Sequence, residues 1–337
     1  MQSWNLIYPE AWQVELRRET AGDPAPDQVL VAMTRSLVSP GTELTCYRGV
    51  FDPGTNWAAW VQYPFYPGYS SAGRVVAVGS EVTGFKVGDR VSSAMAHQQY
   101  YCLPASAVES IPDEISDEEA VWLSLLKVTQ NVVRKCEVRL GDTVVVIGLG
   151  PVGQLVAQLA RLSGAGQVIG IDPLGYRCEA ARRCGTTATL ALEVARAEGP
   201  LRDLTGGELA DIVFDATGAA DVFATACTLA RDYGRIGLVG DSPTPSQQRL
   251  GPGVVSRYLS ILGAHGNMTA PGDSPFYPWT EKRVNEISRL LIRQRRLELD
   301  GLITHRISPD EAPELYRQLE CRGVESIGVI LDWERLN

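Results

Sequence analysis

A glycine-rich turn near the middle of the chain has the pattern of residues that holds a pyrophosphate. Gly148, Gly150 and Gly153 fit G-x-G-x-x-G, between the apolar run TVVVI and the helical pattern PVGQLVAQLARL. The first glycine permits the tight bend, the second lets the backbone approach a phosphate, and the third allows close helix–strand packing. Pro151 and Val152 would open a helix whose free N–H groups and positive dipole end face the phosphates, since the fixed φ of proline suits a first turn. The turn therefore predicts dinucleotide binding.

An acidic residue follows this turn at the spacing that dinucleotide sites use. Asp172 closes the strand-like run QVIGID, 19 residues after Gly153. A carboxylate there accepts hydrogen bonds from ribose hydroxyls and repels a 2′-phosphate, which favours NAD over NADP. Arg177 is close enough in sequence to complicate this preference, for instance by lying over the adenine. The alternative interpretation is an ordinary glycine turn in a sheet that binds no nucleotide.

The segments around this turn predict a parallel sheet. Strand-like runs at 143–150, 167–172, 211–218 and 235–240 alternate with helical patterns. Such alternation is typical of a doubly wound α/β domain with helices on both faces of the sheet. The strands are continuous apolar runs, as in buried parallel strands.

The flanking segments predict a second domain. The first 115 or so residues are rich in short strand patterns and Pro-Gly turns, and the opening residues 1–19 alternate like a strand pair. From about residue 266 the strand–helix alternation stops, and the closing stretch is too small to fold alone. We therefore expect residues 1–120 and 267–337 to form a β-rich domain, with a cofactor domain at 121–266 inserted into it.

Composition excludes several classes of function. The 337 residues include 40 acidic and 31 basic side chains, a net charge of −9, which opposes nucleic-acid binding as the main task. No run reaches the length of a membrane helix, and the first residues lack the layout of a signal peptide. We expect a cytoplasmic protein with reduced thiols, because the seven cysteines are scattered and never spaced C-x-x-C. They are Cys46, Cys102, Cys136, Cys178, Cys184, Cys227 and Cys321.

Five motifs follow one another over nearly the whole chain. They are GRVVAVGSEVTGFKVGDRV (73–91), VRLGDTVVVIGLGPVG (138–153), FDATG (214–218), GRIGLVG (234–240) and DGLITHRIS (300–308). Together they resemble the medium-chain dehydrogenase/reductase superfamily. The resemblance implies a GroES-like catalytic domain, a Rossmann cofactor domain, an active site in the cleft between them, and a homodimer or homotetramer, in which strand 257–266 would extend a sheet across a two-fold axis. The GLGPVG turn resembles the alcohol and polyol dehydrogenase branch; quinone and enoyl reductases more often carry an alanine-rich turn.

The chain departs from this family at the positions of the catalytic metal. Zinc-dependent members carry a Cys, a Gly-His-Glu motif and a third Cys or acid. Here Ser39 stands near the first ligand, Gly68-Tyr69-Ser70 replaces the second motif, and Leu125 or a neighbour replaces the third. Zinc needs thiolate, imidazole or carboxylate ligands, which these residues do not supply. A four-cysteine structural lobe is also missing, since residues 94–106 contain one Cys. We expect a member without zinc.

Without a metal, other groups must stabilise negative charge on the substrate oxygen. Tyr69 stands where a ligand histidine would be and can donate from its phenol. Lys127 lies beside Thr129, which in relatives contacts nicotinamide, and its ammonium would stabilise an oxyanion strongly. Thr217, in the FDATG motif, is a further candidate for cofactor binding. The alternatives are a solvated Lys127 and a Tyr69 ring that simply packs in the core.

A proton relay needs further polar groups. Thr42 and Ser39 could continue such a relay to solvent, with His97 as its titrating member. An isolated histidine is more often structural, and Glu43 more often caps or pairs within its own turn.

Aromatic residues gather in two segments and suggest a substrate larger than ethanol. Aromatic walls supply apolar area or stacking platforms, so the substrate would be cyclic, sugar-like or aromatic. The alternative is that these rings pack a domain interface or a dimer contact. The rings are Phe51, Trp57, Trp60, Tyr63, Phe65, Tyr66 and Tyr69, and, in the second segment, Phe276, Tyr277 and Trp279.

These observations predict a zinc-independent, NAD(H)-dependent oxidoreductase that interconverts a secondary alcohol and a ketone. The expected partners are a small-molecule substrate and a second copy of the chain, with no nucleic acid and no membrane. Two alternatives remain open: an enoyl- or quinone-type NAD(P)H reductase, and a catalytically inactive NAD-binding protein.

Overall fold

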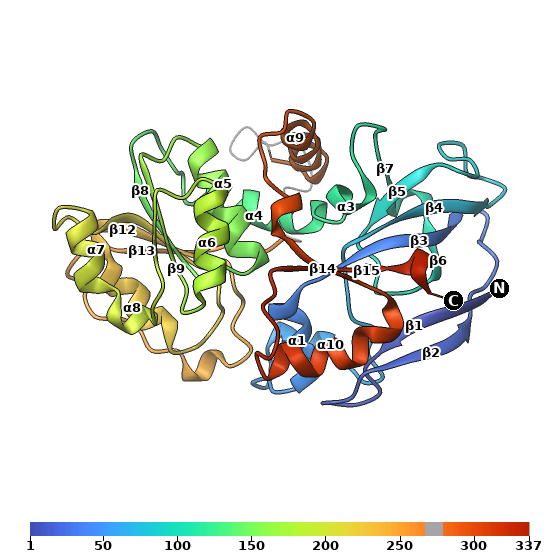
Figure 1. Ribbon diagram of the computed structural model, residues 1–337, viewed down its shortest axis with the longest axis horizontal. Helices are drawn as coiled ribbons and strands as arrows, with labels where there is room; N and C mark the ends of the chain where they lie inside the picture. The colour runs from blue at the N-terminus through green and yellow to red at the C-terminus, as the bar shows by residue number, and fades with distance from the viewer. Residues whose placement is uncertain (267–278, 337) are drawn as a thin grey trace. The chain divides into compact units, whose positions relative to one another are not determined.

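The computed structural model describes residues 1–266 and 279–336. The chain divides into two compact units, with unit 2 (Leu125–Gly301) inserted into unit 1, which combines Met1–Ser124 with the residues from Leu302 on. In Figure 1 unit 1 therefore carries both the blue and the red ends of the colour scale. None of the helices in the described ranges is long and apolar enough to cross a membrane.

Unit 1 is built on a mostly antiparallel sheet, and its described residues form seven strands in the order β14-β15-β3-β4-β5-β7, with β6 paired to β3. Only the β14–β15 pair is parallel among these pairings. The strands are β3 (Gln28–Val38), β4 (Ser71–Val78), β5 (Arg90–Ser93), β6 (Tyr100–Pro104), β7 (Glu109–Ser110), β14 (Ile303–Ile307) and β15 (Gly328–Asp332).

The first strands form a separate antiparallel pair, as the alternation predicts. β1 (Gln2–Ile7) pairs with β2 (Glu15–Thr20), from Gln2 opposite Thr20 to Ile7 opposite Glu15. Single bridges from Asn5 to Gln98 and from Tyr8 to Phe65 tie this pair to the rest of the unit. The helices of unit 1 are α1 (Pro40–Arg48), α2 (Asn56–Trp60), α3 (Asp117–Ala120) and α10 (Ala312–Glu320), with the short 3-10 turns η1 (Ala105–Ala107), η4 (Asp300–Leu302, which begins at the border), η5 (Pro309–Glu311) and η6 (Trp333–Arg335).

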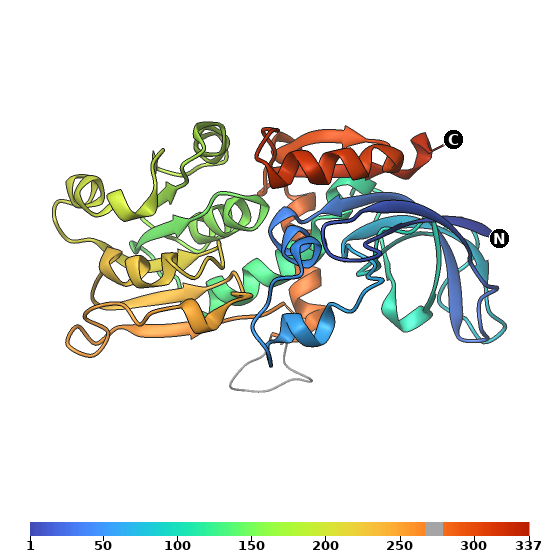
Figure 2. The same cartoon turned by 90° about the horizontal axis from the view of Figure 1, so that it is seen from below.

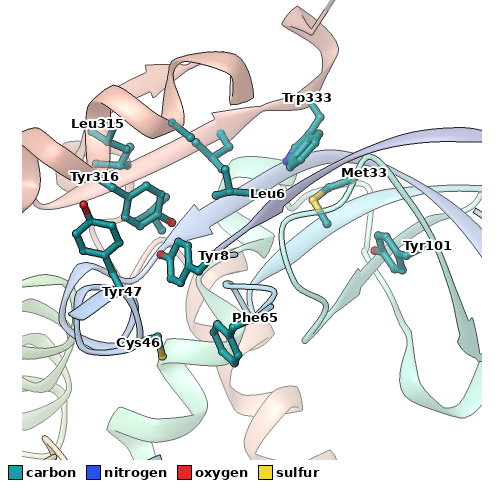
Figure 3. Close-up of a cluster of buried hydrophobic side chains, with 14 of the residues drawn as sticks. Leu6, Tyr8, Met33, Cys46, Tyr47, Phe65, Tyr101, Leu315, Tyr316 and Trp333 are labelled. Atoms are coloured by element: carbon teal, nitrogen blue, oxygen red, sulfur yellow. The ribbon is translucent and has the colours of Figure 1, made fainter. Parts of the chain in front are cut away.

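The core of unit 1 joins residues from both ends of the chain. Figure 2 shows the red segment with α10 and β15 lying against the blue strands of the same unit. Tyr316 of α10 packs edge-on against Tyr8, with ring centroids 5.5 Å apart, and both side chains are fully buried. Their hydroxyl ends point toward one another (Figure 3). The closing stretch from Leu302 therefore completes the N-terminal unit, as expected.

Unit 2 contains the predicted parallel sheet. The described residues of this unit form six strands in the order β10-β9-β8-β11-β12-β13, which is the 3-2-1-4-5-6 order of dinucleotide-binding sheets. All neighbouring pairs are parallel. β13 lies at one end, and its pairing with a second copy remains a prediction. The strands are β8 (Thr143–Ile147), β9 (Gln167–Ile171), β10 (Ala188–Leu190), β11 (Ala210–Asp215), β12 (Ala230–Leu238) and β13 (Ser260–Gly263).

The helices of unit 2 connect these strands. They are α4 (Leu123–Lys135, which begins at the border of the units), α5 (Pro151–Leu162), α6 (Gly175–Arg183), α7 (Glu198–Leu204), α8 (Val222–Leu229) and α9 (Glu281–Arg293), with the short turns η2 (Val194–Arg196) and η3 (Pro245–Gln247). Two helices follow one another at this border: a capping box of Ser116 and Glu119 starts the short α3, and α4 begins at Leu123.

The chain returns to unit 1 at Leu302 rather than at residue 267, where the sequence placed the border. The reason is α9, which packs on α4 within unit 2. Gln130 of α4 donates to Ser288 Oγ at 2.6 Å and to the Val284 carbonyl at 3.1 Å. The hydrophobic pattern of α9 is typical of a helix, but such a pattern does not show which element the helix packs on.

Candidate active site

The glycine-rich turn joins β8 to α5, as the sequence predicts. Gly148 has φ +83°, which a residue with a side chain rarely adopts. A Cβ on Gly153 would lie 1.8 Å from the Gly148 carbonyl oxygen, so that position must be glycine. Gly150 caps α5 and Pro151 is its first residue. A Cβ on Gly150 would meet only Arg177, at 3.9 Å, so the backbone there is open to a ligand.

Asp172 holds this turn from the end of β9. Its Oδ2 accepts the Leu149 N–H at 2.8 Å and its Oδ1 accepts the Leu174 N–H at 2.9 Å. Arg177 Nη1 lies 3.6 Å from Oδ2, and the acid is 3% exposed. Asp172 therefore orders the glycine turn as well as standing at the ribose position. A carboxylate has about four acceptor sites, so capacity for ribose hydroxyls is left.

Thr217 lies beside the glycine turn, where the strand order of the sheet reverses. Its methyl group would be 2.7 Å from a Cβ on Gly148. The buried Asp215 at the end of β11 accepts hydrogen bonds from the Thr217 hydroxyl at 2.6 Å and from its N–H at 2.9 Å. Burial raises the pKa of the Asp215 carboxyl. In α/β sheets ligands bind at this switch point, so the predicted residues of the turn and Thr217 come together there.

The two candidates on α4 already have partners within unit 2. Thr129 is fully buried, and its hydroxyl donates back to the Leu125 and Leu126 carbonyls of its own helix at 2.9 and 3.2 Å. Lys127 Nζ forms an ion pair with Glu281 Oε1 at 2.6 Å. These contacts fit structural roles for both side chains.

Three of the predicted catalytic residues meet in unit 1. The Tyr69 hydroxyl donates to Ser39 Oγ at 2.7 Å and lies 3.3 Å from Thr42 Oγ1. Ser39 is buried before α1, whereas Thr42, on α1, is partly exposed. Burial raises the pKa of the Tyr69 phenol, and its bonds to Ser39 and Thr42 offset this only in part. We call Ser39, Thr42 and Tyr69 the hydroxyl set.

Within the described residues, the side chain of His97 bonds to Glu43 and Ser36 and not to the hydroxyl set, which differs from its predicted place in a relay. Its ring is fully buried. Nε2 lies 3.1 Å from Glu43 Oε2 and Nδ1 lies 2.8 Å from Ser36 Oγ. Tyr316 of α10 also donates to Glu43 Oε2. Sequence reasoning missed this arrangement, because nothing in the pattern around Tyr316 links it to residues near the other end of the chain.

The residues at the family's metal positions do not fit a catalytic zinc ion. In residues 1–266 and 279–336 no three His, Cys, Asp or Glu side chains gather as metal ligands. Ser39 and Tyr69 offer neutral hydroxyls that bond to each other, and Leu125 is a buried apolar residue. Zinc sites use anionic or imidazole donors instead.

Most aromatic rings of the first segment pack in the core of unit 1, which favours the packing interpretation. Trp57 and Phe65 belong to that core. The Tyr63 hydroxyl donates to the Cys46 carbonyl at 2.6 Å. Trp60 is 43% exposed while packing edge-on against Phe65 at 5.2 Å. Of the second segment, Phe276 and Tyr277 lie outside the described residues, and Trp279 stacks on Arg134.

Two family models match the two units. The alcohol dehydrogenase GroES-like domain matches residues 25–113, and the zinc-binding dehydrogenase domain matches residues 151–277. Both models agree with the fold expected from the sequence.

Curated relatives cover most of the chain. D-guloside 3-dehydrogenase of Escherichia coli K12 is 30% identical over 259 residues, 75% of this chain and 73% of the relative. L-threonine 3-dehydrogenase of Vibrio parahaemolyticus is 27% identical over 357 residues, 96% of each.

Solved structures share the fold at lower identity. An alcohol dehydrogenase of Escherichia coli CFT073 complexed with NADH has TM-score 0.80 and 19% identity, and the match covers 98% of this chain and 99% of that one. A protein of Sinorhizobium meliloti 1021 described as a zinc-binding dehydrogenase, bound to NADP, has TM-score 0.79, 21% identity and the same coverage. With the domain matches and the curated relatives, the chain belongs to the medium-chain dehydrogenase/reductase superfamily, in its zinc-type alcohol dehydrogenase branch.

Proposed function

We propose that this chain is a zinc-independent, NAD(H)-dependent oxidoreductase that interconverts a secondary alcohol and a ketone. The observation that carries the proposal is the hydroxyl set. Ser39 and Tyr69 stand at or near positions where the family places metal ligands, and they bond to each other instead, with Thr42 3.3 Å from the Tyr69 hydroxyl. Family membership supports alcohol chemistry, and the hydroxyl set supports a route without a metal.

Unit 2 supplies the residues for the cofactor. The open backbone at Gly150 and the N-terminus of α5 suit a pyrophosphate, and Asp172 suits the ribose hydroxyls. The buried negative charge of Asp172 opposes a 2′-phosphate, which supports NAD over NADP. When bound, nicotinamide supplies the hydride acceptor or donor.

Tyr69 is the proposed donor to the substrate oxygen. Because burial raises the pKa of its phenol, Tyr69 keeps its proton at neutral pH and acts as a hydrogen-bond donor. In ketone reduction this single proton would turn from Ser39 to the oxygen on which negative charge develops, and the Ser39 hydroxyl would then donate to the phenol oxygen. In the opposite direction the alcohol proton must leave, and Thr42, which is partly exposed, continues the chain of hydroxyls toward water.

The names of the relatives and an exposed ring of unit 1 support a proposal for the substrate class. Relatives named for D-guloside and L-threonine support a substrate with a CH–OH group. The exposed ring of Trp60 offers apolar area suited to a cyclic or sugar-like alcohol. We expect the substrate to be of this kind.

Tyr69→Phe tests the proposal. Removing the donor should lower kcat about 100- to 1,000-fold, as the loss of one oxyanion donor does, and leave NADH affinity unchanged. The assay is initial rates on a panel of cyclic and sugar alcohols and ketones, with NADH binding followed by fluorescence. Tyr101→Phe is the matched control, because Tyr101 is a buried tyrosine of unit 1 whose hydroxyl, like that of Tyr69, lies within hydrogen-bond distance of two hydroxyl side chains, here Ser71 and Ser93.

Three results would contradict the proposal. Full turnover by Tyr69→Phe would remove Tyr69 from the site. Activity on enones with NADPH but not on alcohols would favour an enoyl- or quinone-type reductase. Tight NAD binding with no turnover across the panel would favour an inactive NAD-binding protein.

A further inference from the structure

The two segments that carry the hydroxyl set are distant in sequence and meet at one buried side chain. Ser39 and Thr42 lie at the start of α1, and Tyr69 lies just before β4. The fully buried His97 ring contacts both segments. It bonds to Glu43 on the first, and a Cβ on Gly68 of the second would lie 2.7 Å from the ring.

Backbone contacts of His97 strengthen this junction. The His97 N–H donates to the Pro67 carbonyl at 2.8 Å, and its carbonyl accepts the Leu6 N–H at 2.9 Å. Gly68 has φ +99°, and a side chain there would displace the ring. The position of the backbone immediately before Tyr69 is therefore set by His97.

Glu43 links His97 to Ser39 and fixes the position of the Ser39 backbone. Its Oε1 accepts the Ser39 N–H at 2.7 Å, while the Glu43 N–H donates to the Ser39 carbonyl at 2.9 Å. Its Oε2 accepts from Tyr316 and from His97. A carboxylate that is 1% exposed costs a great deal to bury unless such donors compensate it, and three donors do so here.

The proton positions of this group follow from its outer members. Trp333 Nε1–H donates to Ser36 Oγ at 2.9 Å, and Ser36 Oγ is 2.8 Å from His97 Nδ1. The Ser36 hydroxyl proton is then available for Nδ1. Because a carboxylate only accepts, the hydrogen bond between His97 Nε2 and Glu43 Oε2 requires the proton on Nε2.

We propose that Glu43, His97 and Tyr316 are positioning residues that hold Ser39 and Tyr69 at hydrogen-bond distance for the reaction. None of the three joins the proton path; they act through the hydroxyl set. This inference rests on the proposed function of Tyr69. It replaces the predicted relay role of His97 with a positioning role, and it assigns a positioning role to Tyr316 of α10 as well.

Glu43→Gln and Tyr316→Phe test this inference with little change in volume. Both should lower kcat about 10-fold or more while NADH affinity stays within about twofold, because the misplaced donor acts only on the reacting oxygen. Tyr101→Phe again serves as the control for loss of a buried tyrosine hydroxyl. A fall in kcat that matches the control at equal loss of thermal stability would overturn the inference.

A double-mutant cycle separates this inference from the proposed function. If Glu43 acts through Tyr69, Glu43→Gln should have little further effect on kcat in the Tyr69→Phe background. Fully multiplicative effects would overturn the positioning role and leave the role of Tyr69 intact. If Tyr69→Phe alone changes nothing, the proposed function and this inference both fail.

A readout without turnover completes the test. With 3-fluorotyrosine at position 69, the ¹⁹F resonance should move in Glu43→Gln and Tyr316→Phe and stay in place in Tyr101→Phe. An unmoved resonance in the first two variants would show that Tyr69 does not depend on this buried group, and would overturn the inference whatever the substrate.

Discussion

The glycine turn of unit 2 and the hydroxyl set of unit 1 differ in how their residues are brought together. The glycines lie within six consecutive positions, and the strand and helix beside them fix their geometry. The hydrogen bond from Tyr69 to Ser39 spans 30 positions, and the bond from Tyr316 to Glu43 spans 273. Local backbone constraints therefore determine the geometry of the glycine turn, whereas tertiary packing determines the geometry of the hydroxyl set.

Gly153→Ala should have the largest effect on stability and NADH binding, because it disrupts the close backbone contact within the glycine turn. Its Cβ would overlap the Gly148 carbonyl oxygen, so we expect the free energy of unfolding to fall by about 1 to 3 kcal/mol and NADH binding to be lost. The measurements are thermal unfolding and fluorescence titration with NADH.

Gly199→Ala is the control for this glycine substitution. No heavy atom lies within 4 Å of a Cβ there, and the residue lies in α7, so alanine should be neutral or slightly stabilising. A Gly153→Ala protein that binds NADH normally would contradict the close packing of the turn.

Asp172→Asn should have the next largest effect. An amide places an N–H₂ group against one of the backbone N–H donors and removes the charge, so we expect NAD to bind about 10- to 100-fold more weakly, as for loss of a charged hydrogen bond. The affinity for NADP should fall less than the affinity for NAD, so the preference for NAD over NADP should become smaller. Dissociation constants for both cofactors provide the measurement.

The exposed Asp203→Asn in α7 is the matched control for Asp172→Asn. If the ratio of NAD to NADP affinity is unchanged in Asp172→Asn, Asp172 does not determine the cofactor preference.

The difference between local constraint and tertiary packing also explains which features of the fold could be predicted from the sequence. The alternation of strands and helices in unit 2, the glycine turn and the place of Asp172 all follow from local patterns, because apolar runs and glycines act on their immediate neighbours. The return of the chain to unit 1 at Leu302 does not follow from a local pattern, because it depends on the packing of α9 against Gln130.

The candidate site shows the same limit. The sequence indicated Ser39 and Tyr69 by their positions relative to the family's motifs and Thr42 as a further member of a relay, and the structure brings the three together. It did not indicate that Glu43 would be buried between His97 and Tyr316, because a glutamate in a turn is usually solvated. Only the packing of α10 places a tyrosine against it.

Lys127→Ala should have a small effect and so distinguishes two interpretations of this residue. Because its ammonium is paired with the exposed Glu281, we expect turnover to stay within about threefold of wild type, as for loss of a surface ion pair. Glu281→Ala should behave in the same way. If Lys127→Ala alone lowered kcat strongly, the lysine would act on the substrate oxygen, as the sequence suggested.

The pH dependence of ketone reduction should be the weakest effect. Tyr69 acts in its protonated form, and its pKa is raised from 10.0 by burial, so its donor is present throughout the neutral range and is lost only above that raised pKa. We therefore expect rates at saturating NADH to be flat from about pH 6 to about pH 9 as far as Tyr69 is concerned. A fall near neutral pH that disappears in Tyr69→Phe would contradict this role.

Metal content measured together with turnover tests the central claim most directly. The purified protein should contain well below one zinc ion per chain, and its rate on the active alcohol–ketone pair should survive chelation, since Ser39, Thr42 and Tyr69 serve the substrate oxygen. A tightly bound divalent ion present in one equivalent, whose removal abolishes turnover and whose return restores it, would contradict the account.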